Sequence, residues 1–194
     1  MSLIIAIKKD GVVYLGADTR TTVGDRIYPT LTPDNLKIKR VGSCFIGAAG
    51  VVSSIQLMTG HPEWFELNGE PLTKRFIVQN IIPKYYDLAK NANKLETDEK
   101  YGNSPKSECA FIVTDGKRIF EIDDDFEVCE QSEYAVIGCV NHMMQYVLRD
   151  LPSDSVPRET ILKLLRMASH RHNGVGAPYV LIDTKENKLE MVEE

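Results

Sequence analysis

The chain has 194 residues, of which 43% are hydrophobic and 26% are charged, and its formal net charge is −5. This size and composition are typical of one globular domain with its own core, so we expect residues 1–194 to form a single domain. A mildly acidic chain with scattered basic residues is not suited to bind nucleic acid or an anionic membrane surface.

The first 50 residues predict only strands. Two apolar, β-branched runs flank Asp10-Gly11, a dipeptide typical of hairpin turns. A second pair of apolar runs is joined through Gly42-Ser43. The four expected strands are Leu3–Ile7, Val12–Ala17, Lys37–Val41 and Cys44–Ala48.

Two helices are expected next, because apolar residues recur at helical spacing in both segments. Gly60 ends the first helix, and Pro83 lies inside the second and predicts a kink there. Residues 91–107 are polar and contain glycine and proline, which favours an exposed connection. The apolar faces are Val51, Ile55 and Met58 in the first helix, and Ile77, Ile81, Tyr85 and Leu88 in the second.

After these two helices, the sequence predicts three strands, two more helices and a final pair of strands. Asp115-Gly116 predicts a turn between two strands, and Ser155 with Pro157 predicts the start of the last helix. The expected strands are Cys109–Val113, Arg118–Ile122, Tyr134–Ile137, Tyr179–Asp183 and Lys188–Val192. The expected helices carry Val140, Met144, Val147 and Leu151, then Ile161, Leu164, Leu165 and Ala168.

Strand blocks separated by helix pairs favour antiparallel sheets with segregated helix layers over alternating βαβ units. We therefore predict an α+β fold, a four-layer αββα sandwich in which two antiparallel sheets are flanked by helix pairs. The sequence shows no internal repeat and no linker between domains.

The four cysteines form no CxxC pair, which favours free thiols in a reducing compartment. The apolar run Leu3–Ile7 is too short for a signal peptide, and no segment approaches the length of a membrane span. We expect a cytoplasmic protein without membrane contact.

Four segments, in order along the chain, resemble one known family. They are Gly11–Thr22 (GVVYLGADTRTT), Asn35–Ile38 (NLKI), Ile46–Gly50 (IGAAG) and Tyr134–Gly138 (YAVIG). The chain is similar there to proteasome β-subunits and to the HslV peptidase, which are N-terminal-nucleophile hydrolases. The resemblance implies the fold of that superfamily, in agreement with the order of the elements above.

The resemblance places the nucleophile of the family at Ser2, so removal of Met1 would expose its hydroxyl and a free α-amine. An α-amine with a pKa of roughly 8 can act as a general base at neutral pH, and it activates a neighbouring hydroxyl. The resemblance further implies that Lys37 lies beside this hydroxyl, that Asp18 orients Lys37, and that the Gly50 amide binds the oxyanion.

Two further positions depart from the family pattern. Cys139 stands where the family has serine, and a thiol would donate only a weak hydrogen bond toward the terminal amine. Asn173 stands where the family has the serine of Asp-x-x-Ser-Gly, and His170 replaces its aspartate, a departure shared with HslV-type relatives. The resemblance also implies a substrate-binding wall that includes Thr22, Ala48 and Val52, with a preference for apolar residues on the acyl side.

Plainer readings of the same residues stay open. Ser2 would otherwise be an ordinary terminal residue, Asp18 part of a turn, and Lys37 a solvated lysine at a strand edge. His170-x-His172 has the spacing of two metal ligands, but no third ligand is evident, so we expect a solvated loop and no metal site.

The leading prediction is a peptidase subunit that acts on proteins or peptides inside a homo-oligomeric ring or double ring, without a cofactor. An ATP-dependent unfoldase is an optional partner. The alternatives are a non-catalytic assembly subunit and a small-molecule amidase of the same superfamily. The strand that begins at Leu3 favours the β-type subunit over the α-type, which carries an extra helix before that strand.

Overall fold

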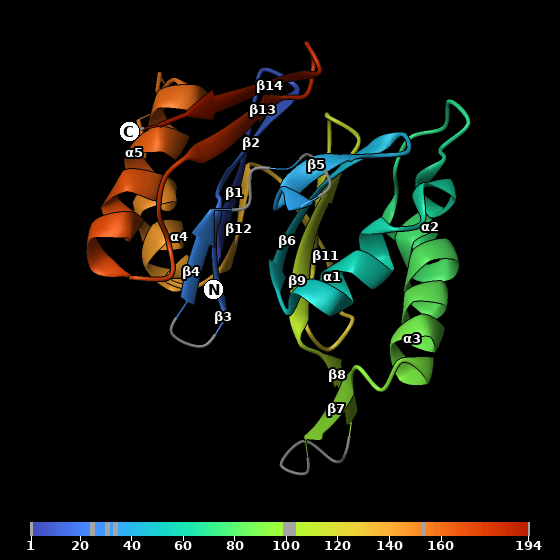
Figure 1. Cartoon of the computed structure of the whole chain (residues 1–194). Coiled ribbons are helices and arrows are strands. Elements are labelled where there is room, and N and C mark those ends of the chain that lie inside the picture. The colour runs from blue at the N-terminus through green and yellow to red at the C-terminus, as the bar shows by residue number, and fades with distance from the viewer. Residues whose placement is uncertain are drawn as a thin grey trace.

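The computed structural model describes residues 2–23, 26–29, 32, 35–98, 104–152 and 154–193. Two five-stranded antiparallel sheets are stacked face to face, and helices cover both outer faces (Figure 1). The strand orders are β12-β1-β2-β13-β14 and β11-β10-β9-β6-β5. This is the four-layer αββα sandwich that the sequence predicts.

The first sheet packs against two helices through alternate residues of its strands. Leu3 and Ile5 point to the helices, whereas Ile4 and Ala6 point to the second sheet. Asp10 and Gly11 both have positive φ, which confirms the hairpin turn. The strands are β1 (Leu3–Lys9), β2 (Val12–Asp18), β12 (Tyr134–Gly138), β13 (Tyr179–Asp183) and β14 (Lys188–Val192), and the helices are α4 (Asn141–Arg149) and α5 (Pro157–Arg171).

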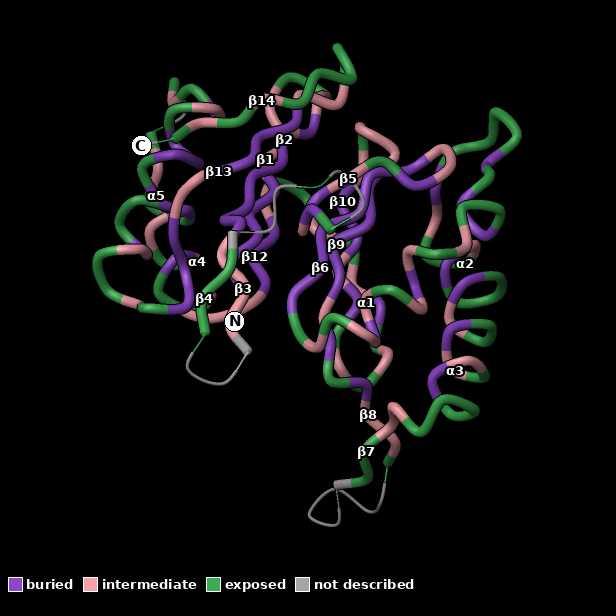
Figure 2. The backbone as a smooth tube through the Cα atoms, in the orientation of Figure 1, coloured by how far each residue is buried: buried purple, intermediate pink, exposed green. Residues whose placement is uncertain are grey.

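The second sheet packs against the other helix layer in the same way. Ile46 and Ala48 point to the helices, and Phe45 and Ala49 point to the first sheet. The strands are β5 (Ile38–Val41), β6 (Cys44–Gly50), β9 (Cys109–Thr114), β10 (Ile119–Ile122) and β11 (Val128–Gln131). The helical segments are α1 (Val52–Thr59), η2 (Pro62–Phe65), α2 (Lys74–Phe76), η3 (Ile77–Ile81) and α3 (Ile82–Asn91). Buried residues are concentrated in the strands, as Figure 2 shows.

Pro83 changes the long helix, as the sequence predicts. Proline has no N–H to bond the carbonyl one turn earlier, so a regular α-helix cannot run through it unchanged. The preceding turn, η3, is π-helical, and the Ile82 N–H donates to the Ile77 carbonyl. The irregularity therefore takes the form of a widened turn.

The sequence does not predict three of the strand pairings. Residues 91–107 are not merely a connection, because β7 (Leu95–Asp98) pairs with β8 (Ser104–Ser107). A second ribbon is made by β3 (Arg20–Val23) and β4 (Arg26–Pro29), and β11 extends the second sheet. Both ribbons carry mainly polar sequence, so they lack the apolar alternation that reveals a strand.

The start of the last helix agrees with the sequence prediction only in part. Pro157 occupies the first turn of α5, but the N-cap is Val156 and not Ser155. All four cysteines are free thiols. Within the described residues, no helix has the length and apolar character needed to cross a membrane.

Glu121 is a half-buried carboxyl between the two sheets. Its neighbours Phe120 and Ile122 point to the helix side of β10, so Glu121 points toward the first sheet. There it lines a polar hollow of about 360 Å³ with Tyr134 and Ala135. Burial, with a smaller contribution from the nearby Asp123, raises the pKa of Glu121 to about 7.

We expect Glu121→Gln to stabilise the protein at pH 8 by about 1 kcal/mol, after discounting for partial exposure, and to have little effect near pH 4.5. The folded-state pKa lies above the unfolded value. The contribution of Glu121 to the free energy of unfolding is therefore fully present at low pH and is lost as the pH rises through about 7. Urea unfolding at both pH values measures this. Glu130→Gln, at an exposed position on β11, is the control, and equal effects of Glu121→Gln at both pH values would contradict the expectation.

Candidate functional site

A buried ion pair joins the end of β2 to the residue before β5. Lys37 Nζ lies 2.9 Å from Asp18 Oδ1 and 2.8 Å from Oδ2, and it also donates to the Arg20 carbonyl. The Asp18 carboxylate is inaccessible to solvent and accepts two backbone N–H groups, from Leu3 at 2.9 Å and Arg20 at 3.0 Å. Both side chains are therefore held in one geometry.

The electrostatics of this pair follow from burial and mutual attraction. Burial raises the pKa of the Asp18 carboxyl, and the charge and hydrogen bonds of Lys37 oppose this shift. Burial likewise lowers the pKa of the Lys37 ammonium, and Asp18 opposes that shift. A lysine that is desolvated and paired in this way is a common feature of functional sites.

Ser2 is anchored next to this pair. The Ser2 carbonyl oxygen accepts the backbone N–H of Cys139 at 2.8 Å and lies 3.1 Å from its Sγ. On its other side, the amide of Leu3 is bonded to Asp18. Burial raises the pKa of the Cys139 thiol, so the thiol stays protonated and can donate. Cys139 thus contacts the carbonyl of Ser2, whereas the resemblance pointed to its amine.

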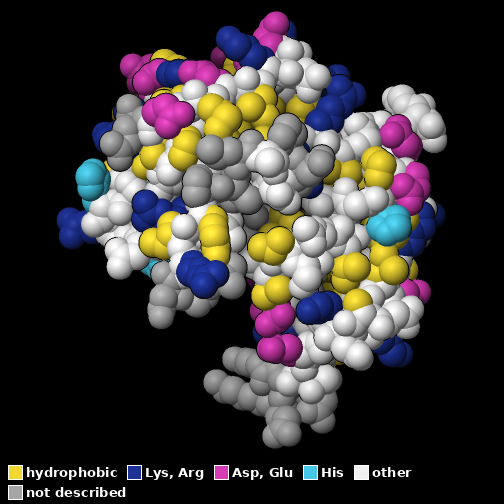
Figure 3. All heavy atoms as spheres, viewed as in Figure 1, with side chains coloured by type: hydrophobic (Ala, Val, Ile, Leu, Met, Phe, Trp, Pro, Cys, Tyr) yellow, Lys and Arg dark blue, Asp and Glu magenta, His cyan; other side chains and the backbone are white. Residues whose placement is uncertain are grey.

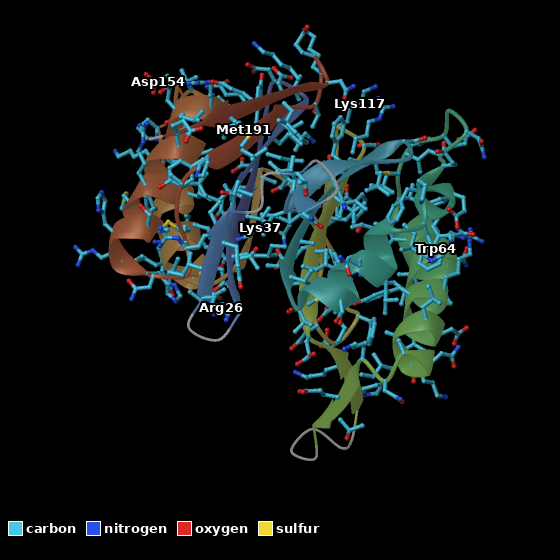
Figure 4. The ribbon with its side chains drawn as sticks, viewed as in Figure 1. Arg26, Lys37, Trp64, Lys117, Asp154 and Met191 are labelled. Carbon is cyan, nitrogen blue, oxygen red and sulfur yellow. The ribbon has the colours of Figure 1, made fainter. Side chains whose placement is uncertain are left out.

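Ser2, Lys37 and Gly50 line one open cleft with a volume of about 930 Å³. The cleft is bounded by the start of β1, the β3–β4 ribbon, β5 and α1, and Figure 4 shows Lys37 between the two sheets. Thr22 and Val52, two of the residues expected to bind substrate, also line it. Met1, whose removal the resemblance requires, lies outside the described residues.

Four expected site residues do not line the cleft: Asp18 and Cys139, whose contacts are given above, and Ala48 and Asn173. Ala48 is 1% exposed and packs under the helix layer, because its side chain points to that face of β6. Asn173 lies in the loop after α5, where its backbone carbonyl accepts the Arg20 Nη1–H at 3.0 Å. His172 Nδ1 accepts the backbone N–H of Gly174 at 3.0 Å in this loop, whereas His170, expected in the same loop, lies in the last turn of α5.

The structure adds residues to the cleft that the sequence reasoning did not single out. Tyr28 comes from the polar ribbon, and Glu108 precedes β9 on the opposite wall. Lys39 lines the cleft two residues after Lys37. Strand alternation from Lys37 could have found Lys39, whereas Tyr28 and Glu108 reach the cleft only through tertiary packing.

Gly50 and Gly138 shape the cleft through their backbones. Gly50 has φ 137°, and an added Cβ would lie 2.1 Å from the Glu108 carbonyl oxygen. Gly138 has φ 99°, and an added Cβ would lie 2.1 Å from the Ser2 carbonyl oxygen. No other residue type fits either position without displacement of the backbone that it contacts.

We expect Gly138→Ala to displace Ser2 and to lower any activity of the site by at least about 100-fold. Gly69→Ala is a matched control, because Gly69 has φ 86° but an added Cβ would meet nothing within 4 Å. Both variants introduce similar backbone strain, and only Gly138→Ala pushes on Ser2. Initial rates and thermal unfolding of both variants test this, and equal rates would refute it.

The stacked sheets and the flanking helix layers form an αββα fold of the HslV and proteasome type. Several solved structures share it. BPH from Thiobacillus denitrificans is 19% identical, with a TM-score of 0.69 over 98% of this chain and 98% of BPH. A second structure of BPH contains epoxomicin.

Two other solved structures are similar over nearly the whole chain. HslV from Trypanosoma brucei is 19% identical, with a TM-score of 0.62 over 99% of each chain. Anbu from Pseudomonas aeruginosa, solved as a helical assembly, is 14% identical, with a TM-score of 0.72 over 99% of this chain and 87% of that one. The sequence matches no protein-family model and no curated protein. At these identities, the likeness shows the fold.

Proposed function

We propose that the protein hydrolyses peptide bonds with Ser2 as an N-terminal nucleophile after removal of Met1. The observation that carries this proposal is the position of Ser2 in the cleft that Lys37 also lines, with the peptide after Ser2 bonded to Asp18. A charged lysine near a hydroxyl and an α-amine lowers the energy of the alkoxide that forms during attack.

The reaction proceeds by acyl transfer. The Ser2 hydroxyl attacks the peptide carbonyl while its proton passes to the α-amine of the same residue. The Gly50 amide donates to the oxyanion, and Lys37, oriented by Asp18, stabilises the developing negative charge. The amine then gives the proton to the leaving nitrogen, and water hydrolyses the remaining ester to free Ser2.

The walls of the cleft support a preference for apolar residues on the acyl side of the cleaved bond. Leu36, Val51, Val52 and Ile55 line the cleft together with the Tyr28 ring. Val52, at the start of α1, is 48% exposed and offers apolar surface beside Gly50. Figure 3 shows hydrophobic side chains at many places on this face, with basic and acidic ones between them.

The proposal is tested with short unstructured peptides, which need no unfoldase. Protein with an N-terminus verified as Ser2 is given a peptide panel that differs only in the residue before the cleaved bond. We expect cleavage after apolar residues and none by protein that retains Met1. Absence of cleavage by correctly processed protein would favour a non-catalytic assembly subunit, and turnover of small amides alone would favour the amidase alternative.

We further propose that the chain assembles into homo-oligomeric rings or double rings. Anbu from Pseudomonas aeruginosa forms a helical assembly, and the outer helix layer of this chain exposes Met143, Tyr146 and Met167 at 41%, 64% and 38%. A contiguous exposed apolar patch marks an interface, and these three side chains on α4 and α5 are candidates for one. Light scattering should give a multiple of 21.8 kDa, and the mass of one chain at micromolar concentration would contradict assembly.

A further inference from the structure

Four polar side chains form a buried group that we call the hydroxyl–thiol cluster: Ser54, Tyr85, Ser107 and Cys109. Each is at most 2% exposed, and the surrounding core between the second sheet and its helices is apolar. Ser107 Oγ donates to the Cys109 carbonyl at 3.0 Å, and the Tyr85 hydroxyl lies beside Ser107. The Ser54 hydroxyl, on α1, lies beside the Cys109 thiol.

This cluster lies directly behind Gly50. Gly50 pairs with Cys109 between β6 and β9, and an added Cβ at Gly50 would lie 2.7 Å from Cys109 Sγ. The Cys109 thiol donates to the Val51 carbonyl at 3.3 Å, and the Val51 N–H donates to the Glu108 carbonyl at 3.2 Å. Both backbone groups of Val51, the residue after Gly50, are therefore held from behind: its N–H by Glu108 and its carbonyl by Cys109.

Stability alone does not explain these polar groups. Within the described residues, the Ser54 and Tyr85 hydroxyls have no partner at hydrogen-bond geometry. Alanine and phenylalanine would occupy the same space without a buried unpaired polar atom, which destabilises a fold. Burial raises the pKa of Cys109 to about 11, so its thiol remains a hydrogen-bond donor at neutral pH.

We propose that Cys109 is a positioning residue that holds Val51, and through it the backbone of Gly50, in the orientation that the Gly50 N–H needs to bind an oxyanion, and that the cluster holds Cys109 in place. The inference rests on the proposed function, because it gives the Gly50 amide the role of oxyanion donor. Cys109 itself is buried and does not line the cleft.

The test compares Cys109→Ala with Cys44→Ala in full-length protein with a verified N-terminus. Cys44 is a matched control, because it is buried in the same core and its thiol lies 3.9 Å from the Phe65 carbonyl, outside the cleft. Cys109→Ala should lower kcat by about 10- to 100-fold with KM changed less than about twofold. Cys44→Ala should reduce thermal stability similarly and leave kcat near that of the wild type. Cys109→Ser, which keeps a donor, should recover most of the rate.

Ser54→Ala separates positioning from stability. Removal of an unpaired hydroxyl from a helix should keep or raise the melting temperature, since alanine is the better helix former. The same variant should lower kcat by about threefold or more, because the thiol loses its neighbour. An unchanged kcat in Ser54→Ala would contradict the role of the cluster.

A second measurement does not depend on peptidase activity. Hydrogen–deuterium exchange of the segment 48–53, followed by mass spectrometry, should be at least about tenfold faster in Cys109→Ala than in Cys44→Ala. Equal exchange, or equal kcat in these two variants, would overturn the inference. If the wild-type protein cleaves no peptide at all, the proposed function fails, and the exchange rates alone decide whether Cys109 positions Gly50.

Discussion

Replacing Lys37 with alanine should lower peptide hydrolysis by at least about a thousandfold. The Lys37 ammonium is held by both oxygens of Asp18 and by the Arg20 carbonyl, and it lines the cleft that contains Ser2. Alanine removes the charge that would stabilise the Ser2 alkoxide. The substitution also leaves a buried carboxyl without its partner, a change that typically costs about 3–5 kcal/mol.

The loss of activity must therefore be separated from unfolding. Circular dichroism and thermal unfolding of Lys37→Ala should show a folded protein with a lowered melting temperature. Lys117→Ala, at the exposed β9–β10 turn far from Lys37 in Figure 4, should match the wild type in rate and stability. Retained turnover in a folded Lys37→Ala protein would remove the catalytic role of Lys37.

Apolar alternation accounts for the parts of the fold that the sequence predicts. β1, β2, β6 and β9 each bury alternate residues against a helix layer and against the other sheet, so their pattern is visible without a structure. β3, β4, β7 and β8 pair through their backbones with little buried apolar surface. Their polar sequences carry no period-2 signal, and they are recognised only once the chain is folded.

Part of the candidate site could likewise be predicted from the sequence, and part could not. The resemblance named Ser2, Asp18, Lys37 and Gly50, and the structure brings Ser2, Lys37 and Gly50 into one cleft with Asp18 buried behind them. The β1–β2 hairpin makes this possible, because its register brings the start of β1 to Asp18 at the end of β2.

Tertiary packing decides the details that the sequence did not supply. The face to which Ala48 points follows from the pairing of β6, and Asn173 contacts Arg20 through its main chain and not its side chain. The contacts of the Cys139 thiol likewise depend on the path of residue 2 beside Gly138. No spacing along the sequence encodes these distances.

Ser2→Ala should abolish covalent chemistry, because it removes the only proposed nucleophile and leaves the rest of the cleft intact. Ser2→Thr should keep or raise the rate, since the added methyl narrows the side-chain rotamers and so preorganises the hydroxyl. Peptide hydrolysis by each variant, after its N-terminus has been verified, measures both effects. Protein that retains Met1 is the control with an intact hydroxyl and no free α-amine on residue 2.

An epoxyketone distinguishes an N-terminal nucleophile from an ordinary serine, because it reacts with the hydroxyl and the α-amine of one residue to close a ring. Intact-mass and peptide mass spectrometry after treatment should therefore show one adduct, located on Ser2. Neither Ser2→Ala nor the protein that retains Met1 should form it, since the first lacks the hydroxyl and the second lacks the free amine. If Ser2→Ala hydrolyses peptides as fast as the wild type and no adduct forms, Ser2 is not the nucleophile. If neither protein hydrolyses peptides, the cleft has no peptidase activity. A non-catalytic subunit that only assembles is then the better explanation of the Asp18–Lys37 pair and the anchored N-terminus.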